Sequence, residues 1–255
     1  MANTAVSYKG MKCYLNTDST NVILSTKAEK IYLNENISDM FYNCRNLLLN
    51  LDSLDWNYDL VKYMSRTFLN CYNLKGSPVC GNNVTNMAGA YYSCKLTGSP
   101  VCGDNVTNMA AAYQSCRNLT GSPVCGNNVI DMAFAYQSCR NLTGSPVCGD
   151  NVIDMAYAYS DCYNLYGNMN ISSFTNKSSS ESGLVKNLFY LRDTSNRLNI
   201  FVPYGSNNIF NILQNANTIP NSITGSNFNW ILDLSNDRFY NASVNIYVYG
   251  GNASV

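Results

Sequence analysis

The feature that most constrains the fold is a sequence repeat between residues 74 and 165. Four successive segments are nearly identical: NLKGSPVCGNNVTNMAGAYYSC, KLTGSPVCGDNVTNMAAAYQSC, NLTGSPVCGNNVIDMAFAYQSC and NLTGSPVCGDNVIDMAYAYSDC. Their equivalent methionines, Met87, Met109, Met132 and Met155, recur at a nearly constant step. Self-similarity at such a period is typical of solenoids, in which each unit buries its apolar face against its neighbours. The repeat therefore predicts a stacked architecture with long exposed surfaces.

Degraded copies of the unit extend the array on both sides. Met64 precedes Met87 by the same step, and the segment FYNC ending at Cys44 is an earlier copy. The array comprises about six units, each roughly 22–27 residues long, which lies in the range of known solenoid repeats. The predicted organisation is an N-terminal β cap or docking segment over 1–35, the repeat array over 36–170, and a degenerate repeat with a C-terminal β-rich cap over 171–255.

Each unit contains two different patterns. The apolar residues Val106, Met109, Tyr113 and Cys116 recur at steps of three and four, which predicts one face of a short helix. The segment LTGSPVCG excludes a helix because of its Gly and Pro, and it predicts a short strand that ends in a turn. Stacked units of this kind give an α/β solenoid with a parallel strand ladder and right-handed crossovers.

The ends of the chain show strand-like alternation of apolar and polar residues. Two such runs, AVSYKGMKCYL and NVILSTKAEKIYL, lie within residues 1–35. Downstream, LNIFVP, NWILDLS and NASVNIYVYG are predicted strands, and residues 207–216 are a predicted short helix.

The repeat also resembles a known family. The run L-x-x-x-P-V-x-x-x-x-V-x-x-M-x-x-A-Y-x-x-C-x-x-L is similar to the BspA-like class of leucine-rich repeats over about residues 36–170. The closing Ala-Phe-x-x-Cys-x-x-Leu of that class is matched, with Tyr replacing Phe, by Ala135, Tyr136, Cys139 and Leu142. The strand departs from the class, since Pro123 precedes Val124 where an apolar residue usually comes first. The resemblance implies a leucine-rich-repeat-like coil with β-rich caps and a role in extracellular recognition or adhesion.

The amino-acid composition limits the classes of partner that the chain could bind. Charged residues make up 13% of the 255 residues and sum to zero, so no electrostatic footprint for nucleic acid or an anionic membrane is present. No continuous apolar run is long enough to predict membrane insertion. The first residues, MANTAVSYKGMKCYLN, lack the layout of a secretory signal.

The residue types argue against catalysis. The chain has no histidine, which excludes Ser–His and Cys–His nucleophiles and most zinc hydrolase sites. Asp104 and Asp150 alternate with Asn82 and Asn127 at one repeat position, which favours a turn oxygen over a calcium ligand. We therefore expect no enzyme activity, no cofactor and no metal site.

The eleven cysteines form no Cys-x-x-Cys pair. Nine of them fall into two columns one unit apart, of which Cys102 and Cys116 are representatives. Their apolar setting and odd total favour small buried thiols, although the spacing leaves bridges between units open.

Twenty tyrosines, with abundant Asn, Ser and Gly, are typical of adaptable binding surfaces. The tyrosines equivalent to Tyr136 are expected in the core, at the family's Phe position. Positions that vary between units are better candidates for ligand contact, although drift on an indifferent surface explains them equally well. The candidate binding positions are Gly89, Ala111, Phe134 and Tyr157, followed by Tyr92, Gln114, Gln137 and Ser160.

The leading hypothesis is a non-enzymatic, exposed virion component of a phage, such as a fibre, tail or decoration protein. Its Tyr/Asn/Ser-rich, low-Lys composition resembles such arrays, and release by lysis needs no signal peptide. Expected partners are a protein or glycan on a host surface, or other virion proteins including copies of itself. The alternatives are a bacterial cell-surface adhesin and a cytosolic protein-binding scaffold.

Overall fold

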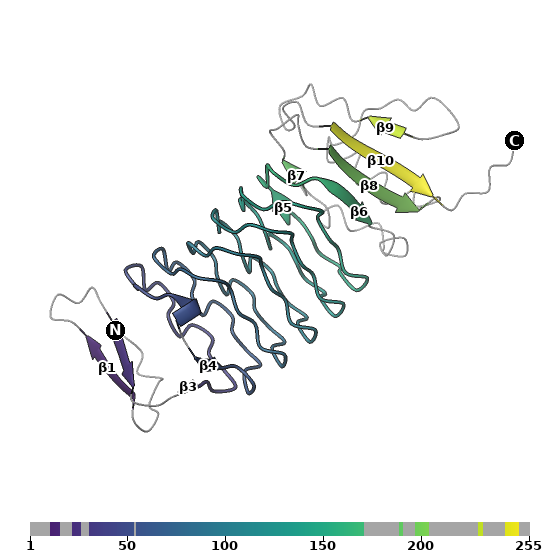
Figure 1. The fold of residues 1–255 in the computed structure, drawn as a ribbon. Coiled ribbons are helices and arrows are strands. Elements are labelled where there is room, and N and C mark those ends of the chain that lie inside the picture. Colours follow the sequence, from purple (N-terminus) through teal and green to yellow (C-terminus); the bar gives the residue numbers. More distant parts are fainter. Residues whose placement is uncertain are drawn as a thin grey trace, which may run out of the picture.

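The computed structural model describes the backbone of residues 11–15, 22–26, 31–53, 55–170, 189–190, 197–203, 229–231 and 243–249, and the side chains of 31–53 and 55–169. Within residues 31–170 the chain winds into a row of stacked coils, one repeat unit per coil (Figure 1). Isolated parallel bridges join equivalent residues of successive coils, and they run in order through Asn36, Tyr63, Asn86, Asn108, Asp131 and Asp154. The repeat seen in the sequence is thus a repeat in space.

Strands lie mostly at the two ends of the stack. The strands β1 (Met11–Leu15) and β2 (Val22–Thr26) form an antiparallel pair. The strands β3 (Ile31–Tyr32) and β4 (Trp56–Asn57) pair in parallel next to the 3-10 turn η1 (Leu51–Ser53).

At the other end, β5 (Tyr159–Ser160) pairs in parallel with β7 (Phe189–Tyr190). A second sheet has the order β6-β8-β10-β9, formed by β6 (Gly167–Asn170), β8 (Arg197–Pro203), β10 (Ser243–Tyr249) and β9 (Asn229–Ile231). The predicted terminal strands therefore appear, whereas the helix predicted over 207–216 lies outside the described residues.

The short helix predicted in every unit is wrong. In the coil that contains Tyr113, a chain of turns replaces it: the amide of Ala112 donates to the Met109 carbonyl, three positions back, at 3.0 Å. The next amide, that of Tyr113, leaves the coil and donates to Ala135 of the following coil at 2.9 Å. An α-helix would keep both bonds within the segment, each joining an amide to the carbonyl four positions back. Alternate amides here are used to join coils instead.

The local reason for turns lies in the polar residue that opens the segment. The side-chain oxygen of Asn108 accepts the amide of Ala110 at 2.9 Å, which is an Asx turn. Ala111 and Ser115 then adopt φ angles of 54° and 63°, which a right-handed helix cannot contain. Successive turns still bring Met109, Tyr113 and Cys116 to the inside, so the spacing that looked helical arises without a helix.

The predicted strand in LTGSPVCG is also absent from residues 97–103. Pro100 has no amide hydrogen to donate, and one backbone bond, from Thr120 to Gly98 at 2.9 Å, links this side of the coil to the next one. The continuous series of parallel bridges lies on another side of the coil, at Asn108 and its equivalents, and the Gly-Ser-Pro side has only isolated bridges near the ends of the stack, such as Gly144 with Leu165.

The core is a set of columns that run through the stack. In a typical coil, six side chains have no exposed surface: Val106, Met109, Ala112, Tyr113, Cys116 and Leu119. The aromatic column is continuous from Phe41 through Phe68 to the buried tyrosines, with ring centroids 5.4–5.7 Å apart and nearly parallel planes. Burial of large rings and their stacking stabilise each coil only when a neighbour is present. No helix in the described part of the chain is long and apolar enough to cross a membrane.

A buried hydroxyl explains why Tyr replaces Phe in four units. The hydroxyl of Tyr113 donates to the Val101 carbonyl at 2.7 Å and accepts the Val101 amide at 3.1 Å. The same pair of hydrogen bonds, one donated and one accepted by the tyrosine hydroxyl, joins a Ser-Pro-Val segment in the units of Tyr91, Tyr136 and Tyr159. Phe68 belongs to a unit without that segment, in which Trp56 stands at the Val position. The extra oxygen is therefore present where an inward-facing backbone needs a partner.

We expect Tyr113→Phe to lower the free energy of unfolding by about 1–3 kcal/mol, because it leaves the amide and carbonyl of half-buried Val101 without the hydroxyl that bonds both. Urea unfolding followed by circular dichroism measures this difference. The half-buried Tyr92→Phe serves as the control, with an expected change within about 0.5 kcal/mol. Equal effects in the two variants would contradict the role given to the buried hydroxyl.

Candidate binding surfaces

The candidate positions of the sequence lie on the turn side of the coils. Four of them form one column in which every residue has a positive φ: Gly89, Ala111, Phe134 and Tyr157, at 61°, 54°, 59° and 57°. Left-handed backbone costs a residue with a side chain about 1–2 kcal/mol, and such strain persists only where the surroundings enforce it. Here the amide of Ala111 donates to Ala133 of the next coil at 2.8 Å, which holds the conformation.

Only part of this surface is available to a ligand. Phe134 is 37% exposed and stacks on Tyr157, with ring centroids 4.9 Å apart. Beside them the amide of Gln114 donates to that of Gln137. Gly89 is buried and Ser160 is only 7% exposed within β5, so neither offers a side chain for contact. Tyr92 is half-buried.

Two members of the same column in the early coils were not among the positions predicted from the sequence. Asp39 and Arg66 have φ angles of 60° and 54°, and their side chains form an ion pair at 2.8 Å. The guanidinium of Arg66 also lies 5.6 Å from the ring centroid of Tyr42. The signal available in the sequence was the position of Arg66, one repeat step before Gly89.

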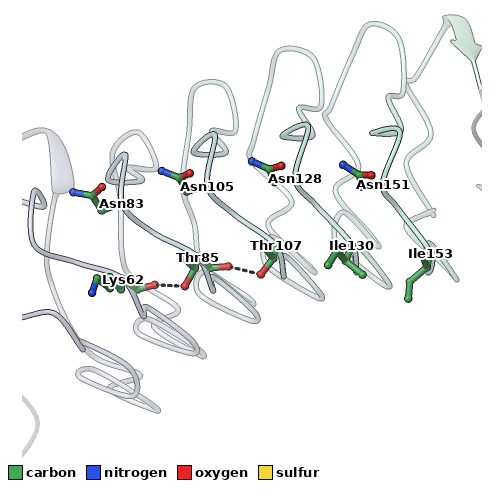
Figure 2. Close-up of a pocket in the computed structure, with 9 residues that line it drawn as sticks. All are labelled: Lys62, Asn83, Thr85, Asn105, Thr107, Asn128, Ile130, Asn151 and Ile153. Carbon is green, nitrogen blue, oxygen red and sulfur yellow. Dashed lines mark hydrogen bonds between the residues drawn. The ribbon is translucent and has the colours of Figure 1, made fainter.

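A second surface is an open groove along the stack, with a volume of about 650 Å³ (Figure 2). We call it the amide groove. One row of its lining consists of asparagines, and the other begins at Lys62 and changes from threonine to isoleucine along the stack. The asparagine row is Asn83, Asn105, Asn128 and Asn151, and the second row is Lys62, Thr85, Thr107, Ile130 and Ile153.

The two rows have a common origin in the sequence. Asn105 and Thr107 flank Val106, whose side chain is fully buried. Side chains alternate between the two sides of an extended backbone, so a buried valine directs its neighbours outward. Each of the four nearly identical units has the pattern Asn-Val-Thr or Asn-Val-Ile, the preceding unit has Leu60-Val61-Lys62, and stacking turns this tripeptide into two parallel rows. The sequence signal was this alternation around Val, which the helical interpretation concealed.

Hydrogen bonds between coils fix both rows. The Asn105 side-chain amide donates to the Asn82 carbonyl of the preceding coil at 2.8 Å, and Asn128 does the same to Asp104 at 2.8 Å. The Thr107 hydroxyl donates to the Thr85 carbonyl at 3.1 Å (Figure 2). The groove lining is therefore held in place before any ligand arrives.

The inner column of cysteines acts as hydrogen-bond donors. The thiol of Cys116 donates to the Tyr91 carbonyl of the preceding coil, with 2.8 Å between sulfur and oxygen, and Cys139 bonds Tyr113 at 2.9 Å. Burial raises the pKa of Cys116 to about 12, and also raises that of Cys139. All ten cysteines among the described side chains are free thiols, and a raised pKa makes them poor nucleophiles.

The outer column of cysteines packs on glycine. A Cβ added to Gly126 would lie 3.3 Å from the Cys102 sulfur and 3.0 Å from the Gly103 carbonyl oxygen, so a side chain there would crowd the preceding coil. Burial raises the pKa of Cys102 as well. Among the described side chains, no group of three His, Cys, Asp or Glu residues gathers into a metal-binding arrangement.

Comparison with known proteins gives little beyond the repeat. No protein-family model and no curated protein matches the chain. The crystal structure of a leucine-rich repeat protein of T. pallidum resembles it at 14% sequence identity and a TM-score of 0.34, over 78% of this chain and 86% of that one. The likeness is weak, so no residue role or activity is transferred from it.

Alkaline pH is expected to destabilise the fold. The Cys116 thiol ionises near pH 9.0 when exposed and near pH 12 when folded, so its contribution is complete below about pH 9 and is lost as the pH rises toward 12. The other buried thiols shift in the same direction. We expect the urea concentration at the unfolding midpoint to decrease as the pH is raised from about 8 to about 10.5. Cys116→Ala should reduce this pH dependence, and a midpoint independent of pH would contradict the assignment.

Relief of backbone strain provides a second test. Ala111→Gly introduces the residue that the preceding coil has at the same position, Gly89. Because glycine adopts a positive φ without a steric cost, this variant should raise the free energy of unfolding by up to about 1 kcal/mol. The adjacent Ala110→Gly, whose φ is not positive, should lower it by about 0.5–1 kcal/mol. Thermal unfolding of the two variants compares them directly, and the same sign in both would refute the strain argument.

Proposed function

We propose that the chain is a right-handed, leucine-rich-repeat-like solenoid of the BspA-like class that acts as a non-enzymatic recognition protein. The observation that carries the proposal is the amide groove, which is pre-formed by bonds between coils and extends from Lys62 to Ile153. Its lining consists of amides, hydroxyls, aliphatic groups and one ammonium group, none of which is arranged as a nucleophile with its base. Such a surface suits an extended ligand that lies along the stack of coils.

The interior supports the same function. Its tyrosine hydroxyls and inner-column thiols bond to backbone atoms, as in the Tyr113 and Cys116 pairs. Burial raises the pKa of both groups, whereas activation of a nucleophile needs a lowered pKa. The core thus serves the stack, and the differences between coils appear on the outside.

The proposed setting is the exposed part of a virion, where the chain binds a host-surface molecule or a further virion protein. The balanced charge and the Tyr/Asn/Ser-rich composition favour recognition without electrostatic attraction. A setting on a bacterial cell surface uses the same groove, and the location experiment below separates the two.

Binding to cells tests recognition. We expect the fluorescently labelled full chain to bind saturably to intact cells of the bacterium that carries the gene or is infected by its phage. Thr107→Lys, which copies Lys62 of the same row, should obstruct the groove and weaken binding at least about tenfold while leaving the thermal midpoint unchanged. Exposed Asn118→Ala, outside the groove lining, is the control.

Location is tested by fractionation after lysis, with an antibody against the chain. Recovery with density-purified particles supports the virion setting, whereas recovery in the cell envelope supports an adhesin. Recovery only in the soluble cell fraction, together with no binding to cells, would refute the proposed recognition role.

A further inference from the structure

The hydrogen-bond directions in the amide groove restrict its ligand. The Asn105 side chain faces the carbonyl oxygen of Asn82, and a carbonyl can only accept. Its NH₂ group therefore points to the preceding coil and uses one of its two hydrogens there, and no bond among the described residues uses its oxygen, which is free to accept. The same geometry holds at Asn83, Asn128 and Asn151, so the first row presents one amide oxygen per coil.

The threonines of the second row are directed in the same way. The hydroxyl protons of Thr85 and Thr107 go to the carbonyls of Lys62 and Thr85, at 3.2 and 3.1 Å. Each threonine oxygen keeps a lone pair for an incoming donor. This row, too, offers acceptors to a ligand.

Backbone groups along the second row are already used. The amide of Thr107 donates to Thr85 at 2.8 Å, and that of Ile130 donates to Thr107 at 2.8 Å. Since these amides and carbonyls bond from coil to coil, the described lining of the groove has no open strand edge to which a peptide could add. Lys62, the one cation among the described lining residues, is paired with Glu35 at 3.0 Å.

We infer that the amide groove binds a neutral, hydroxyl-rich linear glycan laid along the stack. This inference rests on the proposed recognition function and specifies the ligand class. Sugar hydroxyls rotate to donate to the amide and threonine oxygens and to accept from the remaining amide hydrogens, whereas phosphate and sulfate oxygens only accept and leave the threonine oxygens without a donor. The exposed Ile130 and Ile153 provide an apolar strip for the C–H face of a sugar ring.

The regular spacing of acceptors along the groove suits a ligand that is itself a polymer. Acceptors recur once per coil, and the stacked rings of Tyr113 and Tyr136, 5.6 Å apart, give the scale of that interval. A ligand with donors at regular intervals can engage several coils at once, and the summed contacts give an affinity that one sugar cannot reach. Longer chains should therefore bind more tightly than their own monomers.

The experiment is isothermal titration of the full chain with soluble linear glucan, mannan and galactan, each beside its sulfated derivative and its monosaccharide. We expect at least one neutral polymer to bind, its sulfated form to bind at least about tenfold more weakly, and its monosaccharide to give no measurable heat. No binding by any of the three neutral polymers, or tighter binding of the sulfated forms, would overturn the inference.

Two variants use residues that the chain itself carries in these rows. Thr85→Ile combined with Thr107→Ile copies Ile130 and removes two acceptors, and should weaken binding of the neutral polymer by about tenfold. Leu60 stands one repeat step before Asn83, so Leu60→Asn extends the asparagine row by one coil and should strengthen binding severalfold. A gain of affinity cannot arise from misfolding.

The two proposals fail separately. If the chain binds cells but no neutral polymer, the recognition function stands and the glycan inference is wrong. If the double threonine variant binds the polymer as well as the parent while its thermal midpoint is unchanged, the acceptor rows are not the site. Asn118→Ala, an exposed amide outside the groove lining, should leave polymer binding unchanged.

Discussion

The structure depends on backbone hydrogen bonds that leave one coil and end on the next. In the turn segment every second amide, such as those of Ala111 and Tyr113, donates to the following coil, and the amides between them close turns within their own coil. This division of donors satisfies a buried backbone without helix or long strand. It also enforces left-handed conformations at residues with side chains, because the bonds on either side fix the direction of the chain.

The interior and the surface of the coil follow from that constraint. Where turns alone leave a backbone group facing inward, a side chain supplies the partner: the Tyr113 hydroxyl for Val101, and the Cys116 thiol for Tyr91. On the outside, residues that flank a buried valine are held in register by the same stacking, as Asn105 and Thr107 are. The groove is therefore a consequence of how the coils are joined.

The sequence allowed the architecture to be predicted better than its local structure. The nearly constant step between repeated methionines predicted stacked units, and the buried column of Tyr136 and its equivalents is confirmed. The prediction of a helix failed because a spacing of three and four residues between apolar positions indicates only which side chains face inward. Consecutive turns produce the same periodicity when an Asx turn at Asn108 begins the segment. The direction of a hydrogen bond cannot be read from residue spacing, so the role of the Cys116 thiol was not predictable, whereas the two groove rows were signalled by the alternation around Val106 that the helix prediction concealed.

The Tyr113–Val101 pair has a further consequence for the growth of the array. Both residues belong to the same repeat unit, twelve positions apart, so a unit carries the partner for its own inward-facing backbone. The backbone links between units, in contrast, recur at equivalent positions from coil to coil. A gene that gains or loses one whole unit by recombination would thus encode a longer or shorter stack with every internal group still paired. Array length, and with it the number of acceptors in the groove, can change in single steps without redesign of the core.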